Sequence, residues 1–168
     1  MRTDEDPILL EKQLRKASAE GRVDDVKLLL QEVSASAKNE SGSTPLHEAA
    51  FAGHVEVCQA LLANGAEVQE LDQWGATALH HAASRGQRAV ARLLLSSQAD
   101  VNAMTSNLQM PIDLAKAKGH IDLAEELQQE ALRCQEVSRQ HQRKACLRWS
   151  ATFTGTFVVL LAGLYCRT

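Results

Sequence analysis

The sequence predicts an all-α repeat protein that ends in one transmembrane helix. Three observations lead to this fold class. A motif recurs at a fixed period, beginning at positions 44, 77 and 110, and apolar residues within each copy follow the three- and four-residue spacing of a helix face. A final stretch of 18 residues, 149–166, contains no charged side chain. A period of this length is typical of stacked small units, because no single unit can bury its apolar face alone.

Four repeat units are predicted, over residues 8–43, 44–76, 77–109 and 110–137, after an acidic tail at residues 1–7. The second and third units match best, since TPLHEAA at 44–50 returns as TALHHAA at 77–83. The fourth is a degenerate copy. The first keeps the leucine, alanine and glycine spacing but lacks the TPLH box. That loss is expected of a terminal unit, which exposes one face to water.

The repeat resembles the ankyrin repeat. The resemblance rests on the TPLH box, on the Gly53-His54 pair after it, and on the NGAEV segment at 64–68. It implies helix–turn–helix units joined by short hairpin loops. It also implies that His47 and His80 hydrogen-bond the backbone between units. The glycines at the same step, Gly53, Gly86 and Gly119, are expected to end helices with positive φ.

Residues 138–148 are predicted to form a basic stalk after the repeats. Neither glycine nor proline interrupts them, and good helix formers are frequent. The helix that begins near Ile121 either continues through the stalk as a semi-rigid spacer or frays into a mobile linker. The sequence does not separate these two alternatives.

Residues 149–166 are predicted to be a transmembrane tail anchor, followed by a short tail at 167–168. As a helix the stretch would span roughly 24–27 Å, close to the ~30 Å hydrocarbon core of a bilayer. Its ends carry aromatic rings of the kind that prefer the headgroup level. The alternative is an apolar helix buried in a partner protein. The residues expected to face lipid are Trp149, Phe153, Phe157, Val158, Val159, Leu160, Leu161, Leu164 and Tyr165.

Charge divides the chain at the same place. All 21 Asp and Glu residues lie before residue 137, where 13 Lys and Arg leave a net charge of −8. The remaining residues hold five Lys and Arg and no acid, giving +5 and the total of −3. A basic collar before an apolar run suits an anionic cytoplasmic leaflet and places the repeats in the cytosol. The acidic repeats argue against nucleic-acid binding.

No catalytic, cofactor-binding or metal site is predicted. The sequence has no phosphate-binding loop, nucleophile elbow or zinc-protease motif. Its four cysteines, at positions 58, 134, 146 and 166, are widely spaced, which argues against zinc and against a disulfide framework. Cys146 lies beside the predicted anchor, and the sequence leaves open whether its thiol is palmitoylated or unmodified.

Function is therefore expected to come from a binding surface. Carried onto this chain, the resemblance implies a protein partner that contacts the hairpin tips and the concave face of the first helices. Trp74 is the leading candidate, because a tip rarely needs a large ring for packing; the alternative is that the ring folds back onto its own hairpin. An aromatic side chain among polar ones is typical of an interface hot spot. The full predicted set is Trp74, Phe51, Glu48, His81, Arg85, Asp72, Gln73 and Leu108.

The sequence thus predicts a tail-anchored, non-enzymatic adaptor that binds a protein partner in the cytosol, with no small-molecule substrate. A short, moderately apolar anchor suits a thin membrane, such as the endoplasmic reticulum or the mitochondrial outer membrane. The alternative is a soluble inhibitor or regulatory subunit whose apolar C-terminal helix is buried in its partner. The identity of the partner is not encoded in any portable motif.

Overall fold

The structure is a computed structural model that describes residues 6–152, with side chains as far as residue 140. Over this range the elements are helices, and no strand is present. The helices are α1 (Pro7–Glu20), α2 (Val23–Leu29), α3 (Pro45–Ala52), α4 (Val55–Ala63), α5 (Ala78–Arg85), α6 (Arg88–Ser96), α7 (Pro111–Ala117) and α8 (Ile121–Thr152).

The chain divides into two compact units after Gln128. The first unit contains the repeats and the opening turns of α8. The second begins at Gln129, and its backbone is helical as far as Thr152. Among the described residues, none of the helices combines the length and apolar character needed to cross a bilayer. Most of the predicted anchor, residues 153–166, lies outside the described residues, as do residues 1–5 of the acidic tail.

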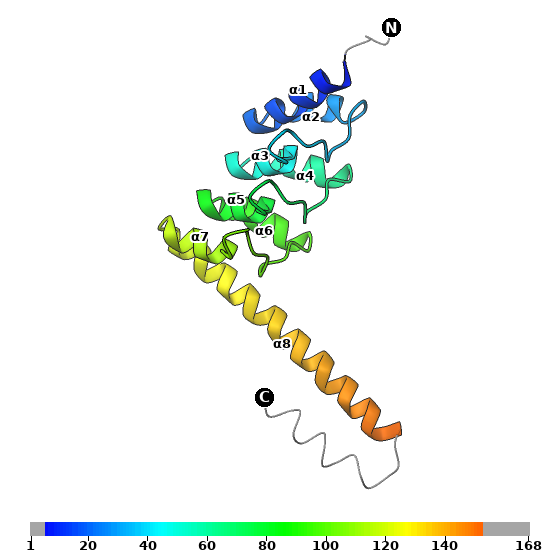
Figure 1. Cartoon of the computed structure of the whole chain (residues 1–168), viewed down its shortest axis with the longest axis vertical. Coiled ribbons are helices and arrows are strands. Elements are labelled where there is room, and N and C mark those ends of the chain that lie inside the picture. Colours follow the sequence, from blue (N-terminus) through cyan, green and yellow to red (C-terminus); the bar gives the residue numbers. More distant parts are fainter. Residues whose placement is uncertain (1–5, 153–168) are drawn as a thin grey trace. The chain divides into compact units, whose positions relative to one another are not determined.

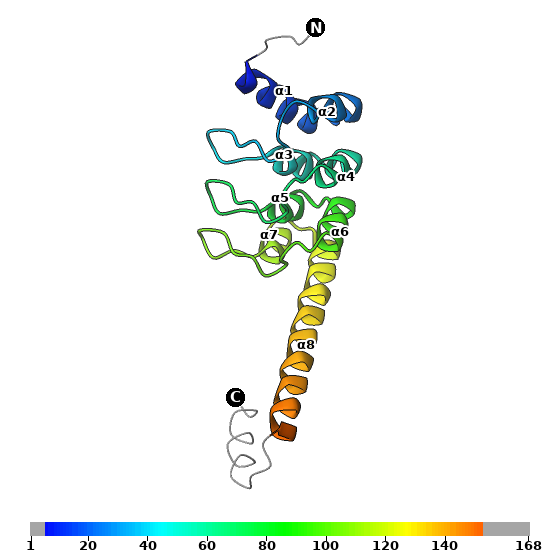
Figure 2. The ribbon, with the colours of Figure 1, turned by 90° about the vertical axis from the view of Figure 1, so that its right-hand side faces the viewer.

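Within the repeat unit the helices form two rows. The first helices α1, α3, α5 and α7 pack on one another in sequence order, and α2, α4 and α6 pack beside them (Figure 1). The loops before α3, α5 and α7 project from one side of the stack, one above the other (Figure 2). This arrangement confirms the predicted all-helical repeat architecture.

A threonine–histidine pair fixes the start of each central first helix. The Thr44 N–H donates to His47 Nδ1 at 3.1 Å, and Thr77 and His80 repeat the bond at 3.1 Å. Because Nδ1 accepts, Nε2 carries the proton and donates to a carbonyl in the next hairpin. In the fourth unit Asp113 replaces the histidine, and its carboxylate accepts the Met110 N–H at 3.0 Å. The predicted bond between units is therefore present in both central units.

Glycine ends α1, α3 and α5, whose C-caps are left-handed. Helix α7 differs, because its C-cap is Lys118 in a right-handed conformation and Gly119 follows with φ +81°. Gly53 has φ +91° and Gly86 has φ +70°, a region in which a Cβ is strained. A Cβ on Gly53 would also collide with the Gln87 side chain from the next unit. For Gly53 and Gly86 the glycine predicted from the sequence thus follows from backbone conformation and from close approach of the next unit, whereas Gly119 shares only the positive φ.

The core of the stack lies between the two helix rows. Small side chains on the first helices allow the rows to approach closely, and branched side chains on the second helices fill the remaining space. The fully buried apolar residues include Leu14, Ala17, Val26, Leu46, Ala49, Ala50, Val57, Cys58, Leu61, Leu79, Ala82, Ala83, Val90, Ala91 and Leu94. Burial raises the pKa of the Cys58 thiol to about 12, so this cysteine is a core residue and not a reactive one.

We predict that Leu94→Ala destabilises the fold by roughly 2–5 kcal/mol, the usual cost of truncating a buried leucine. The Leu94 side chain is 0% exposed in a central unit, whose loss disturbs two neighbours. Leu29→Ala is the comparison, because Leu29 ends α2 in the first unit and is only half-buried. Chemical denaturation of both variants measures the difference. A clearly larger loss for Leu29→Ala would contradict this account of the stack.

Candidate functional site

The candidate site begins at three hairpin tips, residues 39–43, 72–76 and 105–109. Each tip is closed by a backbone bond between its first and last residues, for example from the Asp72 N–H to the Ala76 carbonyl at 3.0 Å. Neighbouring tips are also joined. The Gln73 N–H donates to the Ser41 carbonyl at 2.9 Å, and the Ser106 N–H donates to the Trp74 carbonyl at 2.9 Å. The tips therefore form one connected backbone surface.

The Asp72 carboxylate holds the central tip in shape. Its Oδ1 accepts the Trp74 N–H and the Ala76 N–H, both at 2.9 Å, and Oδ2 contacts His81 Nε2 at 2.8 Å. Burial alone would raise the pKa of this carboxyl. The hydrogen bonds from Ala76, His81 and Trp74 together outweigh burial and lower the pKa below its ordinary value. Asp72 is therefore an ionised structural anchor for the loop that carries Trp74.

The first helices add an aromatic–arginine cluster, which we define as Phe51, His81 and Arg85. The Phe51 and His81 rings meet edge to face, with centroids 6.1 Å apart. The Arg85 guanidinium carbon lies 4.6 Å from the Phe51 ring centroid, a cation–π contact. Because His81 also contacts Asp72, the cluster on α3 and α5 is connected to the central tip.

Behind the cluster lies His47, whose ring meets that of His81 edge to face at 5.4 Å. Burial lowers the pKa of His47, and the nearby His81 lowers it further. Burial likewise lowers the pKa of His80. Both histidines are therefore neutral hydrogen-bonding groups near neutral pH, with Nε2 donating to the Ala76 and Gln109 carbonyls at 3.1 Å each.

The structure separates the predicted contact residues into three groups. Trp74, Phe51, Leu108, Gln73 and Arg85 are exposed, and Trp74 reaches 58% exposure, so its ring does not fold back into the hairpin. Glu48 and His81 are half-buried, and Glu48 accepts the Ser43 hydroxyl at 3.0 Å. Asp72 differs from the expectation, because its side chain is 0% exposed and all its bonds are internal. A short polar side chain in a hairpin tip typically hydrogen-bonds the backbone of its own turn.

Leu108 occupies a strained position in the third tip. Its φ is +58°, where Gly42 and Gly75 stand in the preceding tips with φ of +70° and +71°. The left-handed region costs a non-glycine residue roughly 1–2 kcal/mol. Leu108 is nevertheless 76% exposed, so no burial within the stack offsets this cost. Strained residues of this kind cluster at functional sites.

Sequence reasoning missed a second row of contacts between units. The residue after Gly53, Gly86 or Gly119 reaches back to the preceding unit. His54 Nε2 lies 3.1 Å from the Ala19 carbonyl, and Gln87 Nε2 donates to the Ala52 carbonyl at 3.3 Å. His120 follows the same rule, since a Cβ on Gly86 would meet its ring. These three polar residues recur at the repeat period, and that register was the signal that could have revealed them.

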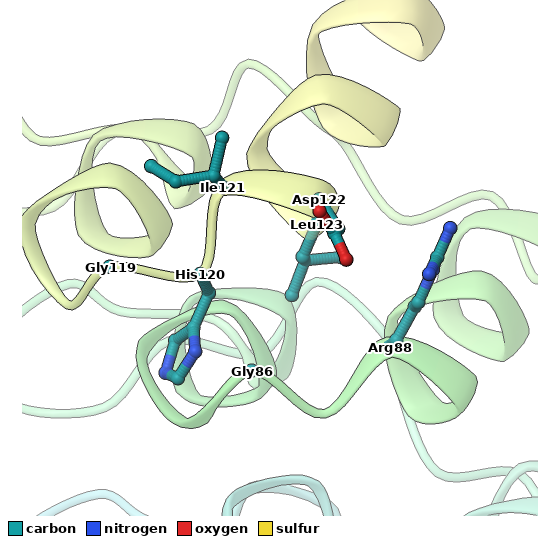
Figure 3. A pocket seen from close by; sticks show the side chains of 7 residues that line it. All are labelled: Gly86, Arg88, Gly119, His120, Ile121, Asp122 and Leu123. Atoms are coloured by element: carbon teal, nitrogen blue, oxygen red, sulfur yellow. The ribbon is translucent and has the colours of Figure 1, made fainter.

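A depression of about 460 Å³ lies where α6 meets the start of α8. Figure 3 shows its lining residues, with the His120 ring beside Gly86 and Arg88 entering from α6. Arg88 pairs with Glu126, which also accepts from Arg92 at 2.7 Å. Arg92 and Arg88 together lower the pKa of Glu126 to about 2. These groups tie α8 to α6 and already have partners, so the depression offers no converging set of reactive groups.

Over the part of the chain that the structure describes, no three His, Cys, Asp or Glu side chains are grouped closely enough to hold a metal ion. The titratable groups with shifted pKa are explained by burial or by the hydrogen bonds given above. The described geometry is that of a rigid surface with exposed aromatic and apolar side chains. It is suited to binding another macromolecule.

Comparison with known proteins identifies the repeat. A family pattern described as ankyrin repeats, in three copies, matches residues 14–105. The match covers just over half of the chain and includes most of the first three units. The degenerate fourth unit at 110–137 lies beyond the match. Comparison with curated protein sequences found no match.

We predict that Leu108→Gly raises the stability of the fold by about 0.5–1 kcal/mol. The substitution removes the ~1–2 kcal/mol cost of the left-handed backbone, although glycine adds ~0.4–1 kcal/mol of unfolded-state entropy. Leu108→Asn is the matched control, because asparagine tolerates this conformation and also removes the apolar side chain. Chemical denaturation measures both. A loss of stability in both variants would show that the Leu108 side chain packs within the stack.

Proposed function

Because the chain belongs to the ankyrin-repeat family, we propose that it is an adaptor that binds a protein partner and is held at a membrane by its C-terminus. Repeats of this family generally mediate protein–protein interaction. The partner contacts the hairpin tips and the concave face formed by the first helices. The role is one of binding and not of catalysis, with no cofactor and no small-molecule substrate.

The observation that carries the binding proposal is the exposed Trp74 on a fixed tip. Its backbone is held on both sides, by the Asp72 carboxylate and by the Ser106 N–H. Its side chain is 58% exposed while its loop is ordered by these bonds. An exposed tryptophan on a backbone held in this way loses little backbone entropy on binding and buries a large area.

The proposal of membrane attachment rests on the sequence of residues 143–168. The uncharged run at 149–166 follows a basic segment that contains Arg143, Lys144 and Arg148. Basic residues on the N-terminal side of the apolar run favour a single-pass anchor with the repeats on the cytosolic side. A thin membrane, that of the endoplasmic reticulum or the mitochondrial outer membrane, matches its modest length. Helix α8 extends to Thr152 and so includes the first residues of this run.

We predict that Trp74→Ala weakens partner capture by ~2 kcal/mol or more and leaves the melting temperature nearly unchanged. An exposed tip side chain contacts the partner more than it contacts its own core. Proximity labelling from the intact protein supplies candidate partners, and interferometry then measures the affinity of each variant.

Glu56→Ala is the control for this test, because Glu56 is exposed on α4, in the second row of helices. It is expected to bind normally. If Trp74→Ala binds the partner normally and Glu56→Ala loses affinity, the partner contacts the second row of helices instead of the tips.

We predict that removing residues 149–168 transfers the protein from the membrane fraction to the soluble fraction without loss of helical circular dichroism. The milder change Val159→Arg places a charge near mid-span, which costs about 2.5–3.5 kcal/mol on insertion scales. Carbonate extraction of cells expressing each form is the measurement. Extraction of the intact chain by carbonate would instead favour the soluble inhibitor, with residues 149–166 buried in a partner.

A further inference from the structure

Arg85 is an uncompensated cation within an acidic region. The chain before residue 137 has a net charge of −8, yet Arg85 forms no ion pair among the described residues. Four of the seven arginines described with side chains, Arg22, Arg88, Arg92 and Arg133, pair with carboxylates. Arg85 instead lies over the exposed Phe51 ring. Its position is thus fixed while its hydrogen-bond donors stay available.

The fourth unit repeats this charge. Lys118 stands one repeat period after Arg85 and directly follows α7, as Arg85 ends α5. It is exposed and has no ion pair among the described residues. Because α5 and α7 pack side by side, the two cations occupy equivalent positions in neighbouring repeat units. Glu48 lies on the other side, on α3. The face is therefore basic toward α7 and acidic toward α3.

Apolar side chains accompany these cations on the hairpins. Leu71 and Met104 directly precede the central and third tips, again one repeat period apart, and are 50% and 55% exposed. Trp74 and Leu108 lie on the tips themselves. The hairpins that lead into α5 and α7 therefore carry most of the exposed apolar side chains of the loops.

We propose that the partner presents an acidic peptide segment that includes a large apolar side chain. Carboxylates of the segment pair with Arg85 and Lys118, and the apolar side chain packs against Trp74 and its neighbours. This inference rests on the proposed function, because it uses the same face. A guanidinium held over a ring is pre-oriented to donate two parallel hydrogen bonds to a carboxylate. The Glu48 carboxylate repels an acidic segment from the α3 side and so sets its direction.

The test selects peptides from a random phage-displayed library on the full-length chain, kept in mild detergent. Recovered peptides are expected to be rich in Asp and Glu and to contain a large apolar residue. Synthetic copies should bind Arg85→Gln about three- to fivefold more weakly, as for a partly exposed ion pair, and the Arg85→Gln/Lys118→Gln double variant more weakly still. Raising salt from ~0.05 to ~0.5 M should reduce this difference.

Lys27→Gln is the matched control, because Lys27 is an exposed cation on α2, in the second row. It should leave peptide affinity unchanged. The charge reversal Arg85→Glu should lose the acidic peptides and select basic ones from the same library. Thermal melts of each variant confirm that folding is intact.

The outcomes separate the two proposals. If the recovered peptides lack acidic residues but fail to bind Trp74→Ala, the proposed charge preference is wrong and the proposed binding face stands. Peptides that bind Trp74→Ala, Phe51→Ala and Arg85→Gln equally well would overturn both. Recovery of no peptide would overturn recognition of a short segment, and the Trp74→Ala test on labelled partners would then decide the proposed function alone.

Discussion

The structure depends on one imidazole in each central unit. His47 accepts the Thr44 N–H through Nδ1 and donates through Nε2 to Ala76, 29 residues away. One ring thus begins a helix and fixes the next hairpin to it. Burial lowers the pKa of both central histidines, so the neutral form needed for this double role is favoured. Such a bond inside the stack is expensive to lose, since its partners would remain buried and unpaired.

Because the hairpins are fixed by their own scaffold, binding at the proposed face would cost little conformational entropy. Bonds between neighbouring tips, and the Asp72 carboxylate within the central tip, hold the backbone before any partner arrives. The aromatic–arginine cluster is in turn connected to Asp72 through His81. A surface ordered by its own scaffold loses less entropy on association than a flexible loop does. Exposed side chains such as Trp74 can then be used for recognition.

In this proposal the chain from α8 onward serves membrane attachment and not recognition. The Arg88, Arg92 and Glu126 group ties the start of α8 to α6 within the repeat unit. Beyond Gln128 the helix belongs to the second unit, which changes in composition from acidic to basic before the apolar run. The proposal thereby assigns recognition and membrane attachment to separate parts of one chain.

The sequence alone determined the repeat, its period, the helices and the glycines that end them, because these follow from local spacing and backbone preference. The resemblance to the ankyrin repeat implied the roles of His47 and His80, and the exposure of Trp74 was one of two alternatives that the sequence left open. The sequence did not reveal that Asp72 points inward, since a carboxylate on a tip has the same sequence signal whether it faces a partner or its own turn. Only the tertiary structure decided which side chains meet across units, as Arg85 meets Phe51 and Gln87 meets Gly53. Such contacts depend on how neighbouring units stack, and that packing is set by the whole core together.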